Sequence, residues 1–92
     1  MTKWGNPVEV ERRNRIKLSI AAYAYEFEDD VIMSDAEFDA LALKIQPEMR
    51  TKNRRMDKFF RDHFQPHTGM WIHKHPERYK LKSLYTEHYA LW

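Results

Sequence analysis

The stretch Ser34-Asp35-Ala36-Glu37-Phe38-Asp39-Ala40-Leu41 decides the fold. Ser34 and Glu37 have the spacing of a capping box, in which the side chain of each residue accepts a hydrogen bond from the backbone N–H of the other. The acids of this first turn also complement the positive end of the helix dipole. The pattern predicts a helix over residues 34–46, which Pro47 ends.

Upstream of this stretch the sequence predicts a longer helix over residues 7–27. Asn6 is a favourable N-cap, and Pro7 presets the backbone of the first helical position. Around residues 18–27 the apolar character spreads round the helix, so we expect it to be covered on more than one side. The two helices should form an antiparallel hairpin joined by an acidic segment. The apolar face of the longer helix comprises Ile16, Ile20, Tyr23, Ala24 and Phe27.

The second half of the chain, residues 48–92, predicts two further helices. One runs from about residue 51 to residue 64 and is ended by Pro66; the other begins near residues 75–77. Between them, residues 70–72 are an apolar triplet, expected to form a short extended segment or a plug under a loop. The predicted fold is therefore mainly α: one small domain over residues 1–92, with an N-terminal helical hairpin.

The composition favours a folded intracellular protein. Hydrophobic residues make up 42% of the 92 residues, and cysteine is absent, which excludes disulfides and thiolate zinc sites. No apolar run approaches the roughly 20 residues of a membrane span, and the N-terminus lacks the apolar region of a signal peptide. We expect a cytoplasmic location and no membrane partner.

The net charge of +2 conceals an asymmetry between the two halves. Residues 1–47 carry 6 basic and 9 acidic side chains, whereas residues 48–92 carry 10 basic and 5 acidic ones. Such a distribution steers charged partners. The basic candidates for contact with nucleic-acid phosphates or with an acidic partner surface are Arg50, Lys52, Arg54, Arg55, Lys58 and Arg61. The acidic candidates for contact with a basic partner surface are Glu26, Glu28, Asp29 and Asp30. Both sets could equally be ordinary solvated faces.

The order Tyr23-Ala24-Tyr25, nine residues, and then Asp35 to Leu41 resembles the Ia domain of bacterial NAD-dependent DNA ligases over roughly residues 12–47. The chain is similar to stand-alone, ligase-Ia-like small proteins of phages. In the ligases this domain is a helical hairpin that grips the nicotinamide mononucleotide half of NAD. The resemblance implies nucleotide-binding roles for Tyr25, Asp35 and Asp39, and for Phe38, which replaces a tyrosine of the family. Glu26 replaces the family's histidine, and a carboxylate there would repel phosphate.

Three functions remain open. The Lys-x-Asp-Gly motif of ligases is absent, so the sequence predicts no catalytic residue, no cofactor and no enzyme activity. The first hypothesis is a phage-type accessory or inhibitor protein, resembling an anti-CRISPR, that binds a host protein or a nucleoprotein complex. The second is a module that binds NAD or nicotinamide mononucleotide, and the third is a simple nucleic-acid-binding adaptor. No metal site is expected, because Pro66 separates His63 from His67 and no thiolate is available.

Overall fold

The computed structural model describes residues 6–88, and within this range it is built from helices. The elements are α1 (Pro7–Phe27), α2 (Asp35–Lys44), α3 (Arg54–His63), the short 3₁₀ helix η1 (Met70–Lys74) and α4 (Arg78–His88). The mainly α prediction is confirmed. Residues 70–72 were expected to be extended or to plug a loop. The extended alternative is wrong, because these residues lie in η1 and bury Trp71 and Ile72.

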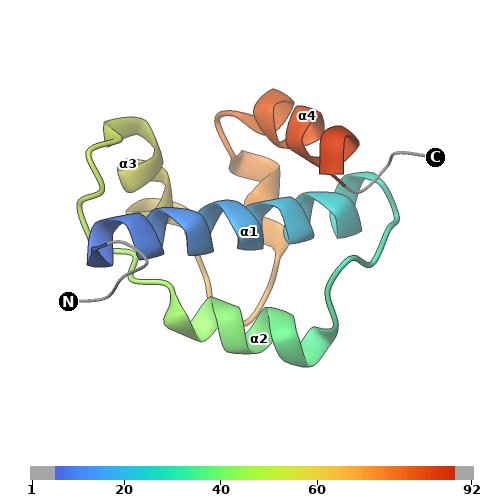
Figure 1. The fold of residues 1–92 in the computed structure, drawn as a ribbon, viewed down its shortest axis with the longest axis horizontal. Helices are drawn as coiled ribbons and strands as arrows, with labels where there is room; N and C mark the ends of the chain where they lie inside the picture. The colour runs from blue at the N-terminus through green and yellow to red at the C-terminus, as the bar shows by residue number, and fades with distance from the viewer. Residues whose placement is uncertain (1–5, 89–92) are drawn as a thin grey trace.

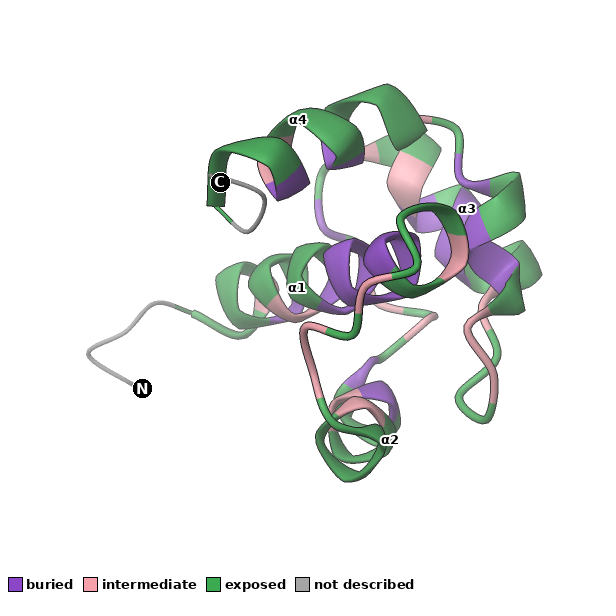
Figure 2. Ribbon diagram, turned by 90° about the vertical axis from the view of Figure 1, so that its right-hand side faces the viewer, coloured by how far each residue is buried: buried purple, intermediate pink, exposed green. Residues whose placement is uncertain are grey.

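Helix α1 is the central element of the fold. It runs through the middle of the molecule, with α2 antiparallel to it on one side and with α3, η1 and α4 on the other (Figure 1). Burial is concentrated on its middle turns, whereas α2 is largely exposed (Figure 2). The prediction that residues 18–27 are covered on more than one side is thus confirmed for residues 18–24, which are all buried.

Local hydrogen bonds explain where the hairpin helices begin. The Asn6 side chain accepts a hydrogen bond from the Glu9 amide at 3.0 Å. Ser34 and Glu37 form the expected capping box, with the Glu37 amide 3.1 Å from the Ser34 hydroxyl. Helix α1 has the predicted bounds, but α2 ends at Lys44, two residues earlier than predicted.

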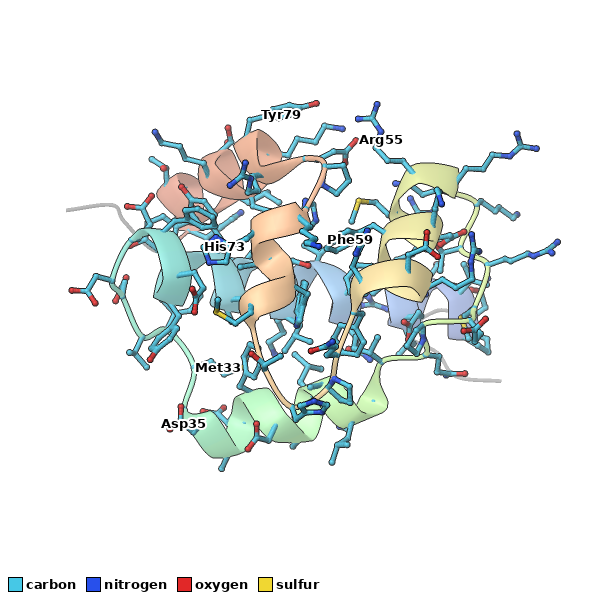
Figure 3. All side chains as sticks on the ribbon, turned by 180° about the vertical axis from the view of Figure 1, so that it is seen from behind. Met33, Asp35, Arg55, Phe59, His73 and Tyr79 are labelled. Atoms are coloured by element: carbon cyan, nitrogen blue, oxygen red, sulfur yellow. The ribbon has the colours of Figure 1, made fainter. Side chains whose placement is uncertain are left out.

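Helix α3 begins three residues later than the sequence suggested. Asn53 is its N-cap and accepts a hydrogen bond from the Met56 amide at 3.3 Å. Lys52 therefore precedes the helix, as Arg50 does, instead of lying on it. Phe59 and Phe60 of α3 are buried, and Phe59 lies between α3 and η1, with its ring centre 6.0 Å from that of Trp71 (Figure 3). Aromatic packing thus fixes α3 and η1 against each other.

Candidate functional site

The predicted basic residues form an exposed surface on α3 and on the link that precedes it. All six side chains, Arg50, Lys52, Arg54, Arg55, Lys58 and Arg61, are exposed. Arg54, Lys58 and Arg61 follow one another at helical spacing over about 10 Å. Figure 3 shows Arg55 extending away from the helix toward solvent. We call this set the basic face.

Acidic neighbours neutralise only part of the basic face. Asp62 lies 2.7 Å from the Lys58 ammonium and 3.8 Å from the Arg61 guanidinium. The hydrogen bond from Lys58 holds the pKa of Asp62 below its ordinary value of 3.8. Arg55 lies 3.5 Å from Glu77. Within residues 6–88 the other three basic residues make no ion pair, so the face keeps a positive charge.

The predicted acidic residues are mostly engaged within the chain. Glu28 accepts a hydrogen bond from the Tyr23 hydroxyl at 2.7 Å, and Asp30 accepts one from the Tyr85 hydroxyl at the same distance. Asp29 has a left-handed backbone (φ 52°) that turns the chain at the end of α1. Glu28 and Asp30 therefore bind the turn to α1 and α4 through these two hydrogen bonds. The charge pattern alone did not predict this structural role.

The four residues implicated by the ligase resemblance line one cavity. Tyr25, Asp35, Phe38 and Asp39 surround a volume of about 240 Å³ between the C-terminal half of α1, the connecting segment and α2. Tyr25 is exposed although it lines the cavity. We call this cavity the hairpin pocket. Its remaining lining includes Val31, Met33, His67, Thr68 and Met70.

The loop before η1 closes the hairpin pocket. Gly69 packs against Ala22 and Phe38, close enough that an added Cβ would lie 3.6 Å from each of them. This contact could not be predicted from the sequence, because residues 67–70 are remote from the hairpin along the chain. Glu26 also lines the pocket, and its carboxylate lies 2.8 Å from the Nε2 atom of His73, which η1 places beside the end of α1 (Figure 3).

A buried polar network beside the basic face was not predicted from the sequence. The guanidinium of Arg15 donates hydrogen bonds to Glu11 at 2.7 Å and to Asp57 at 2.8 Å. It also donates to the backbone carbonyls of Gln46 at 2.8 Å and Met49 at 3.1 Å. All three charged side chains are buried. The network joins α1 to the α2–α3 link and to α3, so it sets the direction in which the basic face points.

Asp57 is the point where the network meets α3. Its carboxylate accepts hydrogen bonds from the amide and the hydroxyl of Thr51 as well as from Arg15. Burial by itself raises the pKa of Asp57, but the hydrogen bonds from Thr51 and Arg15 outweigh it and hold the pKa below its ordinary value of 3.8. Asp57 is therefore ionised at neutral pH and unavailable to a partner.

Two absences apply to residues 6–88. No three histidine, aspartate or glutamate side chains within this range are grouped so that they could hold a metal ion. None of the helices in the same range combines the length and the apolar character needed to cross a bilayer.

Comparisons with protein-family models, with curated proteins and with solved structures give no match to this chain. The ligase resemblance therefore stays a prediction.

Proposed function

We propose that the protein is a non-catalytic accessory or inhibitor protein that docks onto a nucleic-acid-processing or defence complex of a host cell, in the manner of an anti-CRISPR. The observation that carries the proposal is the basic face, on which six cationic side chains are exposed. Within residues 6–88 only two acidic side chains pair with them. Its partner chemistry is a row of phosphates or an acidic protein surface.

Two features of the basic face are unfavourable in the absence of an anion. Arg54 and Arg55 occupy the first turn of α3, where the helix dipole disfavours positive charge. Lys52 has a left-handed backbone conformation, φ 67°, which a lysine rarely adopts. An anionic partner would offset the first of these, because the amide groups of a helix N-terminus and the adjacent cations attract the same negative group.

The acidic turn supplies a second and smaller contact in this proposal. Asp29 is exposed, and no interaction with another residue of the range 6–88 holds its carboxylate. Asp35 and Asp39 at the mouth of the hairpin pocket are exposed as well. These carboxylates would face a basic surface of the partner. The working compartment in this proposal is the cytoplasm, and for a phage protein the cytoplasm of the host.

Charge reversal on the basic face tests the proposal. The double variant Arg54→Glu/Lys58→Glu should no longer retain the host complex in a pull-down from lysate. The binding free energy should weaken by about 2 kcal/mol or more for each charge pair that is buried in the complex and broken by the substitution. The matched control is Lys17→Glu/Lys44→Glu, which makes the same change of charge at exposed sites on α1 and α2. Retention of the same complex by wild type and by both double variants would contradict the proposal.

Fluorescence anisotropy on labelled oligonucleotides separates this function from that of a simple nucleic-acid-binding adaptor. An adaptor binds free strands, with a log–log salt slope of about −0.7 to −0.9 for each phosphate contacted. A protein that needs a protein partner binds free strands weakly even at low salt, which is the result we expect. Tight, salt-dependent binding that Arg54→Glu/Lys58→Glu abolishes would establish the adaptor instead.

The hairpin pocket favours a second function, the binding of a nicotinamide nucleotide. The supporting observation is that all four residues implicated by the ligase resemblance line the same 240 Å³ cavity. The rings of Tyr25 and Phe38 could contact a flat, cationic nicotinamide ring, which the nearby carboxylates of Asp35 and Asp39 would attract. The same carboxylates, together with Glu26, would repel the phosphate group.

Calorimetric titration tests this second function. We expect nicotinamide mononucleotide to bind more weakly than the low micromolar range, and its phosphate-free nucleoside to bind at least as well. Phe38→Leu should weaken both, whereas Leu43→Ala, a change at an exposed residue of α2 outside the pocket, should weaken neither. A mononucleotide that binds in the low micromolar range and loses affinity in Phe38→Leu would make nucleotide binding the main function.

A further inference from the structure

A cleft of about 160 Å³ is lined by residues of α1, α3 and α4. Helices α3 and α4 lie on the opposite side of α1 from α2 (Figure 1). Neither proposed function uses the cleft. Phe60 and Leu81 line it and are buried, and Met56 and Leu84 line it and are half-buried. Ile16 lines it too, yet it is 48% exposed although its spacing predicts a core position. The cleft thus offers apolar surface that the protein itself leaves uncovered.

One buried polar group of the cleft, the hydroxyl of Ser19, has hydrogen-bonding capacity to spare. Among the residues that the structure describes it has no hydrogen-bond partner, and Ser19 is 0% exposed. The ring of His75 is buried and accepts a hydrogen bond from the Glu77 amide at Nδ1, at 3.0 Å. Burial lowers the pKa of His75 to about 4, so at neutral pH the ring is uncharged and its proton is on Nε2. Buried hydroxyl groups normally have hydrogen-bond partners, so the Ser19 hydroxyl favours a ligand that brings a polar group.

The rim of the cleft is positively charged. Arg12 makes no ion pair or hydrogen bond with the other residues that the structure describes. Lys80 lies 3.4 Å from Glu77, but the same carboxylate oxygen also lies 3.5 Å from Arg55. One carboxylate is thus shared between two cations, and Arg12 adds a third. The rim therefore favours a negatively charged group at the mouth.

We propose that this cleft binds a small monocarboxylate with an aromatic or branched aliphatic body. The apolar body would lie on Phe60, Leu81 and Ile16, and the carboxylate would face Arg12 and Lys80. The size agrees, because an apolar cavity of about 150 Å³ accommodates a benzene molecule. The Ser19 hydroxyl would donate its hydrogen to the ligand or to a water molecule that the ligand retains.

Amide chemical shifts of the ¹⁵N-labelled protein test the site with phenylacetate and its neutral analogue phenylacetamide. Phenylacetate should shift the amides around Ser19, Leu81 and Leu84 in a saturable way. Phenylacetamide should bind at least fivefold more weakly, and the variant Arg12→Gln/Lys80→Gln should remove that difference. Equal affinity for the acid and the amide in the wild type would overturn the assignment of an anionic ligand.

Two further variants locate the site. Ile16→Trp fills the cleft from an exposed position and should abolish the shifts. Val10→Trp also introduces a tryptophan at an exposed position of α1, but outside the cleft, and should preserve them. Ser19→Ala should weaken the binding of phenylacetate severalfold. It should not destabilise the unliganded protein, because within residues 6–88 the Ser19 hydroxyl makes no hydrogen bond that the substitution would remove. Saturable shifts that survive Ile16→Trp, or the absence of any shift around the cleft, would overturn the proposal.

Discussion

Replacing Arg15 by methionine should remove a large share of the free energy of unfolding. Methionine retains part of the apolar stem but makes none of the four hydrogen bonds of the guanidinium, so the buried Glu11 and Asp57 lose their counter-charge. Removing one partner of a buried ion pair costs about 3–5 kcal/mol. A domain of this length is stable by roughly 5–14 kcal/mol, so the loss is large on that scale.

Urea unfolding followed by circular dichroism at neutral pH measures this loss. The control Lys17→Met makes the same substitution at an exposed residue of α1 and should change the free energy of unfolding by about 0.5 kcal/mol or less. Arg15→Lys keeps the charge but not the forked geometry of the guanidinium, so its free energy of unfolding should lie between those of wild type and Arg15→Met. This variant can still be measured if Arg15→Met does not fold. Equal stability of Arg15→Met and Lys17→Met would refute the reasoning.

Changes of pH and one cap substitution test the remaining packing. Because burial lowers the pKa of His75 from 6.5 to about 4, the unfolded chain takes up a proton first as the pH falls, and stability should drop by roughly 3 kcal/mol between those values. His75→Asn, which cannot be protonated in this range, should show a smaller drop in urea titrations at stepped pH. The pKa values of Tyr23 and Tyr85 are raised from 10.0 to about 12, for Tyr23 chiefly by burial and for Tyr85 chiefly by its hydrogen bond. The contribution of these two tyrosines to the stability of the fold should therefore be present below pH 10 and be lost as the pH rises toward 12, which thermal melts at stepped pH measure. Ser34→Ala removes a capping box and should lower the free energy of unfolding by about 1 kcal/mol in urea.

Local signals predicted the helices well because each depends on neighbours in the sequence. The start of α1 follows from Asn6 and Pro7, and the start of α2 follows from Ser34 and Glu37. The start of α3 was misplaced because the cap signal of Asn53 competes with three polar residues before it that are compatible with a helix. The 3₁₀ geometry of η1 was missed because an apolar triplet has no period that distinguishes a turn from a strand.

Contacts between remote residues could not be predicted from these signals. The bond from Arg15 to Asp57 joins residues 42 positions apart, and nothing in the sequence distinguishes either of them from exposed charges. The same network explains the early end of α2. The backbone amide of Gln46 donates a hydrogen bond to Glu11, and its backbone carbonyl accepts one from Arg15, so the chain leaves the helix at Ile45 to reach both.

The candidate site was predicted in composition but not in arrangement. Exposure of the basic residues follows from their charge, and the hairpin residues of the ligase resemblance meet at one pocket because α1 and α2 are antiparallel. The engagement of Glu28 and Asp30 by tyrosines was not foreseen. A run of acids is typical of a solvated turn, and only the return of α4 to the end of α1 brings Tyr85 within reach.

The Arg15 network also determines how the binding surfaces relate to one another. Helix α3, which carries most of the basic face, lies on one side of α1, and α2 lies on the other (Figure 1). The hairpin pocket is lined by residues of α1 and α2. The two surfaces share no residue. Arg15 is bonded to the end of the hairpin through Gln46 and to α3 through Asp57. A change at Arg15 should therefore disturb both surfaces together, whereas changes at Phe38 or Lys58 should each affect one surface alone.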